Sequence, residues 1–319
     1  MIDNNKKMEK KNSRVVLFDI MKTLCVIEIV AFWHMFDYTS IDANHVLLGG
    51  RLTSTVLATF TFASGFFLGK KQISSWPFYK SRLKRFMIPL LVSLLIMYLF
   101  GVIHSLRVVC FSAIGLSCFV PPMAPTLWFF SMIILCYIVT PFILYGVWTM
   151  SQTERLVNIL LRGLLVYAVI LLLGASPKVQ MYFFFYIIGI IANMDMIQSI
   201  LKVNIAYKFL LGVIWVLCSL WSVNTFITDS IGIILLIAFS SFIEKHLTDK
   251  TKSVFSKISY ASMFAYLFHR EFYAVAKILC GNADETIPIA GIALTIIAIF
   301  FLSYYMQKIY DFTLTKIKW

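Results

Sequence analysis

Ten apolar stretches, separated by short polar connections, constrain the fold of this 319-residue chain more than any other feature. A helix needs about 20 predominantly apolar residues to cross the roughly 30 Å hydrocarbon core of a bilayer. The stretches lie at about 15–36, 47–69, 86–104, 127–148, 157–173, 180–194, 208–222, 230–243, 258–279 and 287–307. They predict an all-α polytopic membrane protein with about ten transmembrane helices.

The composition agrees with a chain that lies in lipid. Hydrophobic residues make up 60% of it and charged residues 13%, whereas about a quarter of a soluble domain is charged. No connection is long enough to hold a separate soluble domain, so residues 1–319 are expected to form a single integral-membrane domain. Its short basic tail, residues 1–14, has no cleavable signal pattern, so the first apolar stretch is interpreted as a retained span.

The net charge of +13 could suggest nucleic-acid binding, but the positions of the charges argue against it. If the N-terminus is cytoplasmic, 23 of the 28 Lys and Arg residues fall on the inner side of the membrane. The remaining five are Arg51, Arg107, Lys178, Arg270 and Lys277. Cytoplasmic loops of membrane proteins carry this excess of Lys and Arg. The asymmetry therefore predicts that both termini are cytoplasmic, and it leaves no reason to expect nucleic acid as a partner.

The first apolar stretch carries ionisable residues, which are costly at membrane depth and usually face a cavity or a partner. Asp19 and Lys22 are three residues apart and can pair at the cytoplasmic end, so for Asp19 a self-neutralising couple and a functional role are both open. At the other end, the carboxylate of Asp37 can orient the ring of His34, although a histidine there is also common as an interfacial residue. Glu28 lies near the bilayer midplane and is a candidate without a defined role.

A second group of charges lies between the second and third stretches, at residues 70–86. Arg82 and Arg85 are three residues apart, so both guanidinium groups can project to one side of a helix. Guanidinium forks match phosphate and pyrophosphate geometry, although lipid contact and the orientation signal explain basic residues equally simply. Just upstream, Ser64 and Gly65 interrupt an aromatic run, and Gly65 allows close approach of a ligand or of another helix.

Near the C-terminus, His269, Arg270 and Glu271 are consecutive within the ninth stretch. Adjacent helical residues point apart, so Arg270 and Glu271 are expected to neutralise groups on other helices rather than each other. Trp128 begins the fourth stretch and is a further candidate, although an aromatic belt at the outer interface explains it as well. The six cysteines show no metal-type spacing, so no metal site is predicted and the thiols are expected to be unpaired.

Taken in order, these motifs resemble the membrane acyltransferase 3 family, polytopic enzymes that O-acylate cell-surface glycans and other extracytoplasmic acceptors. The motifs are the basic-Asp-basic-His pattern of the first stretch, FASGFFLGKK, FYKSRLKRFMIP, LWFFSMIILCYIVTP and ISYASMFAYLFH. The resemblance covers residues from about 14 to 270. It implies a ten-helix fold in the bacterial plasma membrane.

The resemblance implies a catalytic role for His34, with Lys22 and Asp19 as the charged members of the same motif. The imidazole of His34 can act as a general base on an acceptor hydroxyl or can form an acyl-imidazole intermediate. The sequence does not decide between these two mechanisms.

The resemblance also implies that the chain uses acyl-CoA, commonly acetyl-CoA, from the cytosolic side. Arg82 and Arg85 would contact the acyl-CoA, with Ser64 as a further candidate for the same site. The expected acceptor is a hydroxyl of a surface glycan or of its lipid-linked precursor. Other expected partners are membrane lipid, a second copy of the chain or a polysaccharide-synthesis complex.

One spacing departs from the family pattern. The family has ten residues between the basic residue and the histidine, whereas eleven separate Lys22 from His34. On a regular α-helix the extra residue would turn His34 by about 100° from the expected face. A single π-turn would absorb it, and such turns often occur at functional sites. We therefore predict a π-turn between Lys22 and His34.

Two other classes of protein fit parts of the pattern. A transporter or flippase for a polysaccharide precursor would also have about ten helices and buried charges, but paired broken helices in two matching halves are not evident in the sequence. A non-catalytic scaffold of a glycan-synthesis complex would tolerate substitution of His34 and Arg82. An acyltransferase accounts for more of the motifs than either alternative.

Overall fold

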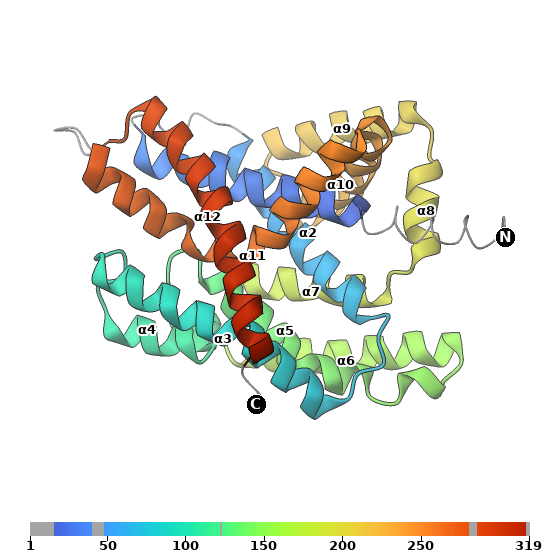
Figure 1. Ribbon diagram of the computed structural model, residues 1–319. Coiled ribbons are helices and arrows are strands. Elements are labelled where there is room, and N and C mark those ends of the chain that lie inside the picture. Colours follow the sequence, from blue (N-terminus) through green and yellow to red (C-terminus); the bar gives the residue numbers. More distant parts are fainter. Residues whose placement is uncertain (1–15, 40–47, 122, 281–285, 317–319) are drawn as a thin grey trace. The chain divides into compact units, whose positions relative to one another are not determined.

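The computed structural model describes residues 16–39, 48–121, 123–280 and 286–316, and every regular element in these ranges is a helix (Figure 1). The first α-helix covers residues 16–27. The following elements are η1 (Glu28–Trp33), η2 (His34–Tyr38), α2 (Gly49–Leu68), α3 (Ser75–Leu99), α4 (Leu106–Ala113), η4 (Leu116–Cys118), α5 (Trp128–Leu144), η5 (Val147–Thr149), α6 (Gln152–Leu172), α7 (Pro177–Ile191), α8 (Met194–Lys202), α9 (Ile205–Leu220), α10 (Thr225–His246), α11 (Asp249–Cys280) and α12 (Ile289–Lys316). The predicted all-helical class is confirmed for the described residues.

Within the described ranges, each of the ten apolar stretches overlaps a helix, and the short helices α4 and α8 are additional. In the described part of the chain, three helices are long and apolar enough to cross a membrane by themselves: α6, α10 and α12. A fourth span is counted if α7 and α8 form one bent span. The helices α5 and α9 are apolar but short, with 17 and 16 residues. Helix length and composition therefore indicate a membrane protein without establishing ten spans.

The chain divides into two compact units. One unit combines Met1–Thr59 with Met194–Trp319, and the other is Phe60–Asn193. The division falls within α2, so the first part of this helix belongs to the first unit and the last part to the second. Each unit is described by itself below.

Several helices begin at polar capping residues that bind the free N–H groups of the first turn. Ser151 and Glu154 form a reciprocal capping box at the start of α6. Asn204 and Asn224 accept hydrogen bonds from Ala206 and Phe226 in the first turns of α9 and α10. The long helix α11 also begins after a polar capping residue, Thr248.

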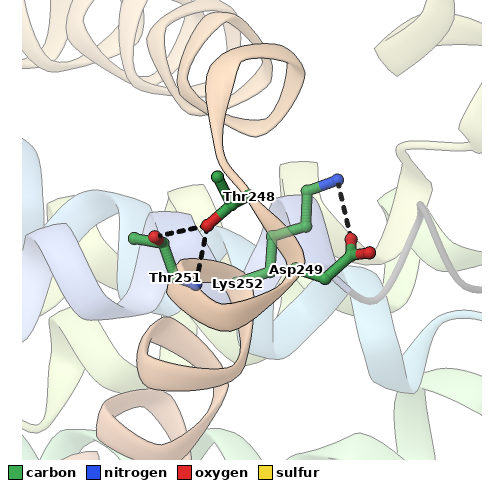
Figure 2. A network of polar contacts seen from close by, with 4 residues as sticks. All are labelled: Thr248, Asp249, Thr251 and Lys252. Carbon is green, nitrogen blue, oxygen red and sulfur yellow. Dashed lines mark hydrogen bonds and ion pairs between the residues drawn. The ribbon is translucent and has the colours of Figure 1, made fainter.

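At the start of α11, Thr248 lies just before the first helical residue (Figure 2). Its hydroxyl accepts a hydrogen bond from the backbone N–H of Thr251 and lies 2.9 Å from the Thr251 hydroxyl. Within the same first turn, Lys252 and Asp249 form an ion pair at 3.8 Å. These local contacts fix where α11 begins.

In the first unit, residues 16–38 run parallel to α11. Near the start of both segments, the hydroxyl of Thr23 donates a hydrogen bond to the carbonyl of Phe255. Near their ends, the rings of Tyr38 and Tyr273 stack with centroids 4.7 Å apart. The start of one segment thus contacts the start of the other, and the two ends also meet, so the two segments run in the same direction. The other face of α11 packs against α12, which crosses it in Figure 1.

In the second unit, glycines bring the end of α2 against α7. A Cβ atom at Gly65 or Gly69 would collide with the backbone of α7 at Tyr186 or Ile190, and one at Gly189 would collide with the carbonyl of Phe62. Helix interfaces in membranes use small residues because they allow the backbones to approach closely. Of the two interpretations of Gly65 in the sequence, the structure therefore supports helix packing.

Candidate functional site

The segment that carries His34 leaves the regular α-helix where the spacing of the motif predicted it would. Residues Glu28–Trp33 form the π-helix η1, and His34–Tyr38 continue as the 3-10 helix η2. The backbone N–H of His34 donates to the carbonyl of Ile29, five residues earlier. The predicted π-turn between Lys22 and His34 is therefore confirmed.

The same carbonyl also holds the side chain of His34. Its Nδ1 lies 2.8 Å from the Ile29 oxygen, and a carbonyl oxygen can only accept a hydrogen bond. The proton of the neutral ring is therefore assigned to Nδ1, and Nε2 carries the lone pair. The sequence suggested Asp37 as the group that orients this ring, but the Nδ1 proton is held by the backbone of the π-turn instead.

A second imidazole lies against His34. The ring centroids of His34 and His269 are 4.6 Å apart, with a tilt of 48°, although 234 residues separate them in the chain. Both side chains are buried, with exposed fractions of 7% and 1%. Nδ1 of His269 donates to the Tyr266 carbonyl at 2.8 Å, so this ring also presents a lone pair on Nε2. Among the described residues, that Nε2 is buried without a hydrogen-bond partner.

Adjacent contacts fix the position of the two histidines along their segments. Arg270 forms an ion pair with Asp37 at 3.0 Å, so it neutralises a group on another segment, as the sequence predicted. The hydroxyl of Tyr273 donates to the carbonyl of Val30 at 2.9 Å. Glu271 is buried on the neighbouring position of α11. This arrangement of His34, His269 and their supporting contacts is called the His34 seam below.

At the opposite end of the first segment, Asp19 is tied to α11. Its two carboxylate oxygens accept hydrogen bonds from the hydroxyls of Ser256 and Ser259, at 2.9 and 2.8 Å. Lys22 lies one turn further along and is half-buried. These contacts give Asp19 a clear role in holding the first helix against α11.

Three consecutive hydroxyl residues on α2 contact two acidic residues of the first unit. Thr53 donates to Glu28 Oε1 at 2.7 Å, while Ser54 and Thr55 donate to the two oxygens of Asp229 at 2.7 and 2.9 Å. Asp229, on α10, is fully buried, and the sequence analysis overlooked it. In the sequence, Asp229 could have been recognised as a single carboxylate directly before the apolar stretch 230–243. Among the described residues, no group of His, Cys, Asp and Glu has the geometry to hold a metal ion.

The remaining candidates belong to the second unit. Arg82 lies on α3 with its guanidinium group 4.9 Å from the ring centroid of Tyr137 and 5.4 Å from that of Phe78. Arg85 lies one turn further, is exposed and is also within electrostatic reach of Tyr137, whose phenol hydrogen-bonds with Ser64. Within the described residues, neither arginine forms an ion pair with a carboxylate. Arg82, Arg85, Tyr137 and Ser64 are together called the Arg82 face below.

Trp128 begins α5 and stacks on Tyr182 with ring centroids 5.9 Å apart. The preceding Thr126 is buried and has a φ of 65°, an uncommon conformation for a β-branched residue. Trp128 is thus half-buried and packs against α7 within the second unit. The six cysteines are free thiols in this structure.

Comparison with known proteins assigns the chain to a family. A model of the acyltransferase domain of the acyltransferase 3 family matches residues 15–308, which is almost the whole chain. No curated protein and no solved structure is similar enough to the chain to count as a match. The chain therefore belongs to the acyltransferase 3 family, and it is a membrane-type helical acyltransferase.

Proposed function

We propose that the protein transfers an acyl group, acetyl in the simplest case, from cytosolic acyl-CoA to a hydroxyl of an extracytoplasmic glycan or of its lipid-linked precursor. In this proposal the chain spans the bacterial plasma membrane about ten times, with both termini in the cytoplasm. His34 carries the chemistry, and the Arg82 face binds the donor.

The observation that carries the proposal is the state of His34. Its Nδ1 proton is held by the Ile29 carbonyl, so the lone pair of the neutral ring is on Nε2, the atom that acts as a base or a nucleophile in this proposal. The backbone fixes this ring in a buried position, and a preorganised imidazole of this kind suits acyl transfer from a thioester. In a chain of the acyltransferase 3 family, this is the simplest role for such a histidine.

Donor binding is assigned to the Arg82 face because of its positive charge. Arg82 and Arg85 have no carboxylate partner among the described residues, so their charges remain available for an anion. Two guanidinium groups one turn apart can bind the phosphates of CoA through charge-assisted hydrogen bonds. The rings beside Arg82 hold its guanidinium group in place through cation–π contacts.

The topology of the proposal is supported by the parallel run of residues 16–38 and α11. In a chain of ten consecutive spans, the first and the ninth cross the membrane in the same direction. A cysteine introduced after residue 316, in a background without the native cysteines, should react only with membrane-permeant thiol reagents. Labelling of intact cells by an impermeant reagent would contradict the cytoplasmic C-terminus.

Surface-glycan ester content tests the activity itself. Cells that express the wild type, His34→Asn or Arg82→Ala are compared at equal membrane abundance of the protein. Loss of ester in both variants is expected. The matched controls are His246→Asn and Arg107→Ala, because His246 has the same Nδ1 contact with a backbone carbonyl and Arg107 lies over the Phe111 ring as Arg82 lies over its rings. Unchanged ester in both test variants would favour a transporter or a scaffold.

A further inference from the structure

We infer that His34 and His269 divide the reaction between them: His34 carries the acyl group covalently, and His269 is the base that activates the acceptor hydroxyl. The inference rests on the proposed function and deepens it, because it selects one mechanism for the site. It starts from the contact between the two buried rings and from the unpartnered Nε2 of His269.

Chemistry explains why a second imidazole matters. A histidine that acts as a general base in a single step needs no neighbouring base. A histidine that becomes acylated on Nε2 has used its lone pair, so another group must remove the proton from the acceptor hydroxyl in the next step. A second imidazole in ring contact with the first supplies that group.

The geometry around the pair fits these two roles. In both residues a backbone carbonyl holds the Nδ1 proton, so each ring has its lone pair on Nε2. Among the carboxylates of the first unit, Asp37 is held in the ion pair with Arg270. Glu28 accepts a hydrogen bond from Thr53 through Oε1, and its Oε2 is buried without a hydrogen-bond partner among the described residues. A buried polar atom without a partner is uncommon in proteins and calls for an explanation. For Nε2 of His269, the explanation offered here is the hydroxyl of the acceptor.

In the first step, the Nε2 lone pair of His34 attacks the carbonyl carbon of the thioester. The C–N bond forms while the C–S bond breaks, and CoA leaves as the thiolate. His34 becomes an N-acylimidazolium, and its Nδ1–H remains bonded to the Ile29 carbonyl, which stabilises the positive charge.

In the second step, the acceptor oxygen attacks the acyl carbon while its proton moves to Nε2 of His269. The C–O bond forms, the C–N bond breaks, and the electron pair returns to Nε2 of His34. The proton on His269 then passes to water, and the thiolate of CoA takes one proton from water. The products are the ester and CoA, and no oxidant or reductant is needed.

The variant His269→Asn separates the two steps. The amide nitrogen of asparagine can replace Nδ1 as the donor to the Tyr266 carbonyl, but it has no group in place of Nε2. Membranes that contain the full chain and the endogenous acceptor are mixed with labelled acetyl-, propionyl- and succinyl-CoA. We expect about one CoA per protein to be released in the first turnover, followed by ester formation that is slower than wild type by about 100-fold or more.

Hydroxylamine serves as a probe nucleophile because it attacks an acyl-imidazole at neutral pH without a base. It should restore turnover of His269→Asn, with the hydroxamate as product, and it should not restore His34→Asn, which releases no CoA. His246→Asn is the control and should keep wild-type turnover. His269→Gln replaces His269→Asn if the latter does not reach normal membrane abundance.

Two results would overturn this division of roles. One is wild-type ester formation by His269→Asn at normal abundance. The other is the absence of the first-turnover CoA release in that variant, which would mean that both histidines act in a single step. If the wild type itself released no CoA from any of the three donors, the proposed function would fail, and this inference with it. A failure of the first two kinds leaves the proposed function intact.

Discussion

The His34 seam and the Arg82 face differ in how their charged and polar groups are satisfied. At the His34 seam, the two imidazole rings are buried and backbone carbonyls hold their Nδ1 protons, while Arg270 pairs with the exposed carboxylate of Asp37. At the Arg82 face, the guanidinium group of Arg82 lies on two aromatic rings, Arg85 is exposed, and no carboxylate among the described residues neutralises either cation. The seam is thus organised before any ligand arrives, whereas the face keeps its charge available for an anion. A donor bound through its phosphates and an acyl group transferred by a fixed imidazole would need this combination.

The largest expected effect tests whether the π-turn is what organises the seam. Inserting one alanine after Phe32 should rotate His34 by about 100° and reduce acyl transfer by about 100-fold or more. Deleting Phe32, which is 61% exposed, should convert the π-turn to an α-turn and keep the histidine on the same face. Activity of the deletion variant should therefore stay within about tenfold of wild type. CoA release in membranes measures both, and equal loss in the two variants would contradict the role of the π-turn.

The next effect concerns the Arg82 face. Arg82→Ala should raise KM for acyl-CoA by about 10- to 100-fold, because hydrogen bonds to charged groups contribute about 1.5–3 kcal/mol. The turnover number should change little, since the phosphates are bound equally in the ground state and the transition state. Steady-state kinetics over a range of acyl-CoA concentrations separate the two parameters, with Arg107→Ala as the control. A fall in kcat at constant KM would assign Arg82 to the chemistry instead.

A third prediction separates packing from ligand binding at the glycine that precedes the Arg82 face. Gly65→Ala should destabilise the protein by about 1–3 kcal/mol, because the added methyl group meets the Tyr186 carbonyl. Thermal unfolding in detergent measures this change. Gly212→Ala on α9 has no atom within 4 Å of the new methyl group and should be neutral or slightly stabilising. If Gly65→Ala raised KM for acyl-CoA without a loss of stability, Gly65 would belong to the ligand site.

The smallest effect is expected at the exposed end of the seam. The Asp37–Arg270 pair is partly exposed, with 49% of the Asp37 side chain accessible, and such pairs contribute at most about 1 kcal/mol. Asp37→Asn should therefore change thermal stability slightly, and by less at high salt. The control variant is Asp249→Asn, because the solvent-exposed Asp249 forms an ion pair with Lys252. A large loss of activity in Asp37→Asn would show that the carboxylate does more than hold Arg270.

Whether a feature could be predicted from the sequence depends on how far apart in the chain the residues that determine it are. The helical class, the π-turn before His34 and the position of Arg82 and Arg85 one turn apart depend on neighbouring residues, and the sequence predicted all of them. The contact between His34 and His269 depends on two segments far apart in the chain, so the sequence identified both histidines without pairing them. Asp229 was overlooked because its partners, Ser54 and Thr55, lie in an apparently apolar stretch about 175 residues away.

The double role of the Ile29 carbonyl has a consequence for mutational studies of this protein. Every amino acid supplies a backbone carbonyl, so replacing the side chain at position 29 leaves the group that fixes the His34 proton in place. A scan of single substitutions would therefore report on the packing of the buried Ile29 side chain and miss the contribution of its carbonyl. An extra residue inserted between Ile29 and His34, in contrast, separates this carbonyl from the ring, so the spacing of these two residues is itself part of the site.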